Sequence, residues 1–124
     1  MASRMDENQI AKSDLEATFD HYWRIFDGPP LEPEYRFDSE RKYRFDRCHI
    51  ISQVAIELDG GTWIPGGGRH NRASSFEKDA EKYNEAALKG WAVLRVTTQQ
   101  VTSGYAMQLL ERALQPVVSQ EQAS

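Results

Sequence analysis

Residues 54–58, VAIEL, form an almost wholly apolar stretch that carries a single carboxylate, Glu57. The stretch lies inside a β-rich run over residues 49–58, and the sequence Asp59-Gly60-Gly61 ends it. A short apolar run bounded by turn residues is typical of a strand covered on both faces. We therefore predict a central strand with a charged side chain near its end.

The part of the chain before this strand is patterned as one helix and two strands. Apolar side chains recur at helical spacing over 14–26, Ser13 or Asp14 can cap the helix, and the glycine and prolines at 28–30 stop it. Residues 35–37 and 41–46 alternate aromatic with charged side chains, as half-buried strands do. A polar turn over residues 38–40 joins these two strands.

The part after the central strand repeats helix and strand. Residues 65–72 are glycine-rich and basic, which predicts a flexible loop. The elements predicted beyond it are a helix from Ser74 or Ser75 to about Lys89, ended by Gly90, a strand over 91–96, and a last helix from Thr102 or Ser103 to the residue before Pro116. Strands joined through a helix lie parallel, and directly connected ones form an antiparallel meander. The expected fold class is α/β, in the order α-β-β-β-α-β-α, with a mixed central sheet flanked by helices.

Length and composition favour one globular domain. The chain has 124 residues, of which 40% are hydrophobic and 27% charged, and no apolar run approaches the ~20 residues of a membrane span. We expect a single domain over 13–115, with disordered tails at 1–12 and 116–124. The absence of an apolar signal segment and the single cysteine, Cys48, favour an intracellular, cytoplasmic location.

The net charge of −4 is unevenly distributed. Residues 35–47 hold five basic and three acidic side chains, and residues 69–95 hold six basic and four acidic ones. These two weakly basic segments flank the carboxylate of the central strand. Such a pattern suits a phosphodiester substrate held over a cation, and it is equally typical of a solvated surface of mixed charge.

Two carboxylates stand out as candidate ligands of a metal ion. Asp46 closes the second strand, and Glu57 lies near the end of the third, so neighbouring strands could bring them together. Hydrolysing a phosphodiester requires charge neutralisation and an activated water, and carboxylate-held Mg²⁺ supplies both. Glu16 of the first helix could add a third carboxylate, and Asp59 shares a strand face with Glu57. The alternative for Glu57 is a structural ion pair with an arginine such as Arg44 or Arg95.

The order of elements and the two motifs YRFD (43–46) and IELD (56–59) resemble those of PD-(D/E)XK nucleases. That superfamily has a restriction-endonuclease-like core and pairs an aspartate at one strand end with Glu-x-Lys on the next. In this sequence Asp59 stands where the family has its lysine. The resemblance implies a lysine supplied from elsewhere, and the helix after the loop offers Lys82, which we favour, and Lys78. Its role would be to orient the attacking water and to stabilise developing negative charge.

The similarity points most closely to two branches of the superfamily. Glu16 is similar to the first-helix glutamate of phage and archaeal Holliday-junction resolvases. The segments over 57–63, 69–70 and 90–95 resemble very-short-patch repair endonucleases. His70 could act as a general acid or contact phosphate, although a surface histidine is an equally good interpretation. The predicted DNA contacts are Arg44, Arg69, Arg72, Lys78 and Asn84.

The resemblance therefore implies an endodeoxyribonuclease dependent on Mg²⁺, with Mn²⁺ able to substitute. The favoured substrate is a Holliday junction or other branched DNA, and cutting two strands symmetrically implies a homodimer. The alternatives are a monomeric nicking or mismatch-repair endonuclease acting on duplex DNA, and a non-catalytic DNA-binding module on a degenerate nuclease fold. The glycine run lacks the context of a phosphate-binding loop, which argues against a nucleotide cofactor, and no membrane association is expected.

Overall fold

The structure is a computed structural model that describes residues 11–60 and 69–115, with side chains in the second range from Phe76 onward. Helix α1 spans Lys12–Phe26 and starts from Ala11, which offers no side-chain cap. Neither Ser13 nor Asp14 caps the helix, and Lys12 belongs to the helix rather than to an N-terminal tail. The helix begins at least two residues earlier than expected because Asp14 and Leu15 donate their backbone N–H groups to the Ala11 carbonyl.

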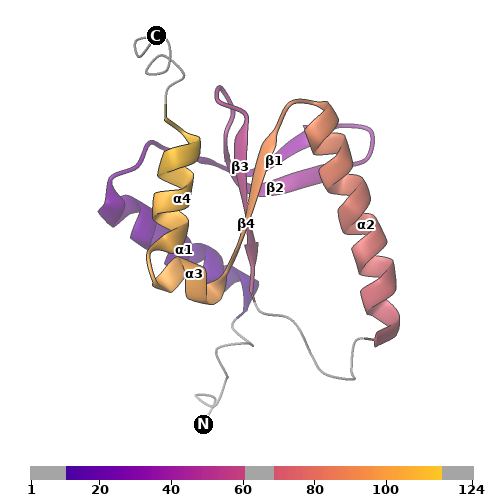
Figure 1. Ribbon diagram of the computed structural model, residues 1–124, viewed down its shortest axis with the longest axis horizontal. Helices are drawn as coiled ribbons and strands as arrows, with labels where there is room; N and C mark the ends of the chain where they lie inside the picture. Colours follow the sequence, from indigo (N-terminus) through magenta and orange to yellow (C-terminus); the bar gives the residue numbers. More distant parts are fainter. Residues whose placement is uncertain (1–10, 61–68, 116–124) are drawn as a thin grey trace.

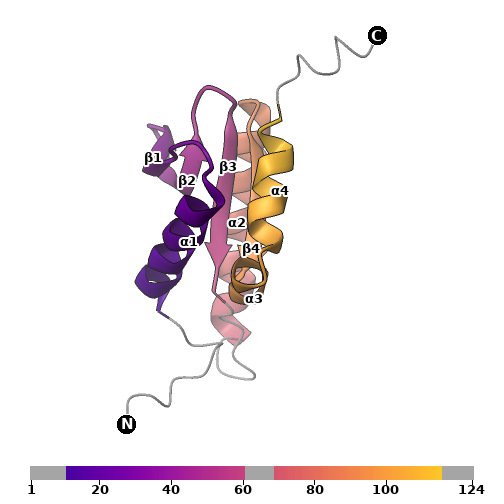
Figure 2. The same ribbon diagram turned by 90° about the vertical axis from the view of Figure 1, so that its left-hand side faces the viewer.

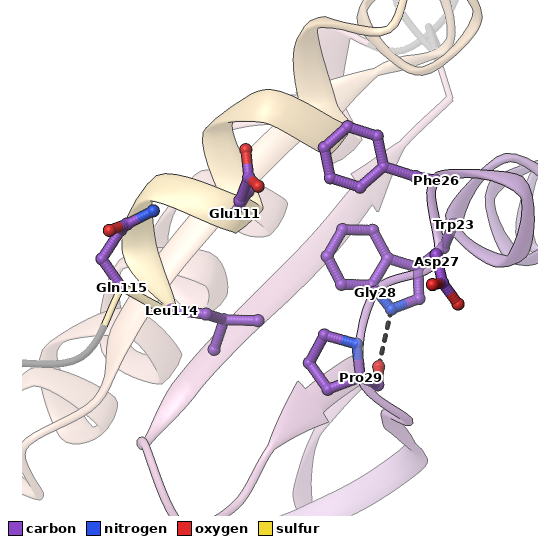
Figure 3. Close-up of a pocket in the computed structure, with 8 residues that line it drawn as sticks. All are labelled: Trp23, Phe26, Asp27, Gly28, Pro29, Glu111, Leu114 and Gln115. Atoms are coloured by element: carbon purple, nitrogen blue, oxygen red, sulfur yellow. Dashed lines mark hydrogen bonds between the residues drawn. The ribbon is translucent and has the colours of Figure 1, made fainter.

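The end of α1 is determined by the close packing of Gly28 against the Trp23 ring. Asp27 adopts a left-handed conformation with φ 67°, and the Trp23 indole donates a 2.7 Å hydrogen bond to the Pro29 carbonyl (Figure 3). A Cβ atom at Gly28 would overlap the Trp23 ring, so glycine is required there. The predicted stop at 28–30 is confirmed, and its cause is the packing of this indole over the turn.

In the described part of the chain, four strands form the sheet in the order β1-β2-β3-β4. Their bounds are β1 (Glu32–Asp38), β2 (Tyr43–His49), β3 (Val54–Asp59) and β4 (Ala92–Thr97). The pairs β1–β2 and β2–β3 are antiparallel, and β3–β4 is parallel. The mixed sheet and the direction of every strand pair are as the sequence predicts. Pro33 lies in β1, an edge strand, where a missing backbone N–H costs little.

Helices cover both faces of the sheet (Figures 1 and 2). Helix α2 (Arg69–Leu88) lies on one face, and α1 lies on the other with α3 (Thr98–Thr102) and α4 (Tyr105–Ala113). The strand β3 separates two cores, because alternate side chains point to opposite faces. Val54, Ile56 and Leu58 pack with α1 and α4, while Ala55 packs with Phe45 and with Ala86 of α2.

Several predicted boundaries were wrong. The run over 49–58 is not one strand: His49 ends β2, residues 50–53 turn, and β3 starts at Val54. Likewise β1 starts at Glu32, the strand predicted from residue 41 starts at Tyr43, and residues 69–72 belong to α2 instead of a loop. The predicted last helix corresponds to α4, which starts at Tyr105, and the short α3 before it was not predicted. Within the described residues, no helix is both long and apolar enough to cross a membrane.

Candidate functional site

The two carboxylates singled out in the sequence lie together where β2 and β3 part. Paired residues run from His49 and Val54 to Arg47 and Ile56, and pairing stops there. At the next position the backbone N–H of Asp46 donates to Glu57 Oε2 at 2.9 Å, and the N–H of Leu58 donates to Asp46 Oδ2 at 2.8 Å. The two carboxylates thus take over the hydrogen bonds that the strands no longer make to each other. Both residues are buried, with 9% and 8% of their surface exposed.

On the α2 side, Glu57 receives two further contacts. The Lys82 ammonium lies 2.6 Å from Glu57 Oε1, and the Tyr83 hydroxyl donates to the same oxygen at 3.3 Å. Burial, with a smaller contribution from the Glu57 charge, raises the pKa of Tyr83, so its hydroxyl remains a donor at neutral pH. Lys82, rather than Lys78, is the lysine that meets the site, and Lys78 is exposed on α2.

On the α1 side, Arg47 ties the helix to β2. Its guanidinium donates two 2.9 Å hydrogen bonds to the Asp20 carboxylate and lies 3.6 Å from Glu16 Oε1. A third bond runs from Arg47 Nη1 to the Asp46 carbonyl at 2.6 Å. This bridge holds Glu16 close to Asp46, as expected for the first-helix carboxylate.

Lys12 brings a cation to the same place. Its ammonium lies 3.1 Å from Asp46 Oδ2. Burial alone would lower the pKa of Lys12, but attraction to Asp46, and more weakly to Glu57 and Glu16, outweighs it and raises the pKa. Lys12 is therefore a charged neighbour of three carboxylates.

A further carboxylate comes from Glu34 on β1, which the sequence interpretation missed. Carboxylate oxygens of Glu16, Glu34 and Asp46 lie within 4.8 Å of one another. Glu34 has φ 51°, unusual for a residue with a side chain, and it lies between the paired residues Pro33 and Tyr35, where the β1–β2 register is unchanged. Extending the first strand back to Glu32 would have placed Glu34 opposite Asp46. The sequence pattern did not predict this part of the strand, because proline and glutamate are uncommon in strands.

This trio fits a hard divalent cation in ligand type and spacing. Opposite oxygens around Mg²⁺ or Ca²⁺ are separated by about 4–5 Å, twice the metal–oxygen distance. Glu57 adjoins the trio through Asp46, but its oxygens are committed to the Asp46 N–H, Lys82 and Tyr83. Asp59 lies outside the trio, and its carboxylate pairs with Arg95 at 3.1 Å where β3 ends.

The remaining predicted residues lie mainly on exposed surface. Arg44 has 58% of its side chain exposed and lies 3.9 Å from Glu34 Oε1, and Lys78 and Asn84 are exposed on α2. The side chains of Arg69, His70 and Arg72 lie outside the described part of the structure. The alternative prediction, that Glu57 pairs with an arginine, was wrong. Among the described residues the cationic partner of Glu57 is Lys82.

Two cavities among the described residues are lined by other residues than these carboxylates. One cavity of about 220 Å³ lies between the last turns of α1 and α4 and is lined by Trp23, Phe26 and Leu114 (Figure 3). Another, of about 360 Å³, is lined by residues of the β2–β3 turn and the segment before β1. At the carboxylates, half of the Glu34 side chain is exposed, so a large substrate can reach the trio.

Comparison with protein-family models, with curated proteins and with solved structures found no match to this chain. The site must therefore be interpreted from its own chemistry.

Proposed function

We propose that this chain is a Mg²⁺-dependent endodeoxyribonuclease with a restriction-endonuclease-like core of the PD-(D/E)XK type. The observation that carries the proposal is the exchange of hydrogen bonds between Asp46 and Glu57, with Lys82 on Glu57 and Glu16 beside Asp46. An aspartate at one strand end, a glutamate on the next strand and a lysine on the glutamate are the elements of that nuclease site. The lysine comes from α2 because Asp59 stands at its usual position.

The side chains divide into two roles in this proposal. Asp46, Glu16 and Glu34 would hold the metal ion, which when bound polarises the phosphate and lowers the pKa of a coordinated water. Glu57 and Lys82 lie on the α2 side, where the carboxylate can accept a proton from water and the ammonium can stabilise negative charge on phosphate oxygens. Tyr83 fixes the Glu57 carboxylate by donating to it.

The favoured substrate is branched DNA, cut by a homodimer in the manner of a Holliday-junction resolvase. The exposure of half of the Glu34 side chain supports a polymeric substrate, and the exposed side chains of Arg44, Lys78 and Asn84 can contact its backbone. A monomeric nicking enzyme would use the same chemistry. Light scattering and a comparison of substrates separate the resolvase from the nicking enzyme. A monomeric protein that cleaves linear mismatched duplex in preference to four-way junctions would argue against the resolvase.

One observation favours a non-catalytic DNA-binding module instead. Lys12 and Lys82 each neutralise one of the two central carboxylates, as in a structural ion-pair network. DNA binding without cleavage, in Mg²⁺ and in Mn²⁺, would identify this alternative.

The test is a panel of four-way junction, single-stranded and duplex DNA, incubated with the protein and Mg²⁺ or Mn²⁺. Glu57→Ala should lower cleavage by about a hundredfold or more, because it removes the acceptor for a proton and the partner of Lys82. Glu111→Ala is the matched control, since Glu111 lines the cavity between the last turns of α1 and α4. Full activity in Glu57→Ala would show that the site is assigned wrongly, whatever the substrate.

A further inference from the structure

The Lys12 side chain lies at the carboxylate trio, although its position in α1 is unfavourable for a cation. It is the first residue of α1, where the helix dipole favours acidic side chains and disfavours cations. Its ammonium is 3.1 Å from Asp46 Oδ2, and 53% of its side chain is exposed against 12% for Asp46. The contact with Asp46 therefore outweighs an unfavourable place in the helix.

The other cations near the trio are anchored by different partners. Arg47 is fixed by two hydrogen bonds to Asp20, and Lys82 is fixed on the far oxygen of Glu57. Arg44 reaches Glu34 only at 3.9 Å. Lys12 differs because a long, half-exposed side chain can rotate into solvent without disturbing the backbone of α1.

We propose that Lys12 is the resident cation of this site: its ammonium and a divalent metal ion compete for Asp46, so Lys12 leaves when metal binds. The inference rests on the proposed function, because it requires the trio to bind metal. An ammonium and a metal ion cannot both lie against the same carboxylate oxygen without strong repulsion. The metal-free protein thus keeps the buried Asp46 carboxylate neutralised, and metal entry displaces the Lys12 side chain.

The displaced ammonium also connects metal binding to the substrate. Once away from Asp46, it lies at the mouth of the site, where it can contact a DNA phosphate. A phosphate that holds Lys12 outward removes the competitor, so DNA and metal should each raise the affinity for the other by the same factor.

Isothermal titration with Mn²⁺, in the absence of DNA, tests the competition. If the ammonium occupies Asp46 about nine-tenths of the time, Lys12→Met should bind Mn²⁺ about tenfold more tightly than wild type. Lys12→Arg keeps the charge and should stay near wild type. Lys42→Met is the matched control, because Lys42 is exposed in the β1–β2 turn, and its affinity should not change.

The outcomes separate the two proposals. Equal Mn²⁺ affinity in wild type and Lys12→Met overturns the role of Lys12 while the metal site stands. If wild type and all variants fail to bind Mn²⁺, the proposed function falls and the inference falls with it. A tenfold gain in both Lys12→Met and Lys42→Met would reduce the effect to net charge and would also overturn the inference.

Discussion

Replacing Lys82 by methionine tests which of two candidate lysines of α2, Lys82 or Lys78, acts at the site. Lys82 and Lys78 lie one turn apart on α2, so helical spacing alone does not separate them. In the structure Lys82 lies 2.6 Å from Glu57 Oε1, and no ion pair of Lys78 is found among the described residues. Methionine keeps the aliphatic stem and removes only the charge, so Lys82→Met tests the contact itself.

The expected loss of stability follows from burial. Lys82 has 18% of its side chain exposed and Glu57 has 11%, which places the pair between an exposed ion pair, worth up to about 1 kcal/mol, and a broken buried pair, which costs about 3–5 kcal/mol. Glu57 keeps its bonds to the Asp46 N–H and the Tyr83 hydroxyl. We therefore expect Lys82→Met to lower the free energy of unfolding by about 2 kcal/mol. Lys78→Met should stay within about 0.5 kcal/mol of wild type.

Urea unfolding of the metal-free protein, followed by circular dichroism, measures both variants under the same conditions. The cleavage assay adds the functional arm, in which Lys82→Met should lose about a hundredfold in rate while it still binds DNA. If Lys82→Met and Lys78→Met unfold at the same urea concentration, the energetic reasoning is wrong. If Lys78→Met is the variant that stops cleavage, the lysine role belongs to Lys78.

Two further predictions concern the fold. Gly28→Ala should lower the free energy of unfolding by about 3 kcal/mol in urea titration, because the new methyl group overlaps the Trp23 indole, and an unchanged midpoint would contradict that packing. Burial raises the pKa of the Cys48 thiol to about 11 from an ordinary value of 9.0. The unfolded chain therefore loses this proton first, and stability should fall as pH rises from 9 toward 11, a slope that Cys48→Ala should reduce in pH-dependent unfolding. An identical slope in that variant would exclude the thiol as the cause.

The sequence predicts the elements better than their ends. Periodicity correctly placed the helix over 14–26, because it depends on which face is buried. The connections between the strands correctly predicted the meander and the parallel β3–β4 pair. The turn over 50–53 was missed because Ile50 and Ile51 are β-branched, yet Ile51 is 91% exposed. Helix α3 had a local signal that was overlooked, the capping box of Thr97 and Gln100.

The candidate site was partly predictable for a similar reason. Asp46, Glu57 and Lys82 lie in recognisable patterns, and the contact between Asp46 and Glu57 follows from strand order. Glu34 depends on a positive φ inside an edge strand, which has no counterpart in residue periodicity. Lys12 depends on where α1 begins, and helix ends are the least certain part of any sequence interpretation.

The position of the carboxylates follows from the sheet itself. Strand β3 continues to pair with β4 as far as Asp59 and Thr97, but its pairing with β2 stops at Ile56. The β2 side of β3 therefore has backbone N–H groups without a strand partner, and a buried N–H without an acceptor is costly. Asp46 supplies the acceptor for one of them, and Glu57 supplies the acceptor for Asp46 in return. The same carboxylates that would serve metal chemistry thus also accept hydrogen bonds from backbone N–H groups. Variants at either residue should therefore be measured for stability before any loss of cleavage is assigned to catalysis.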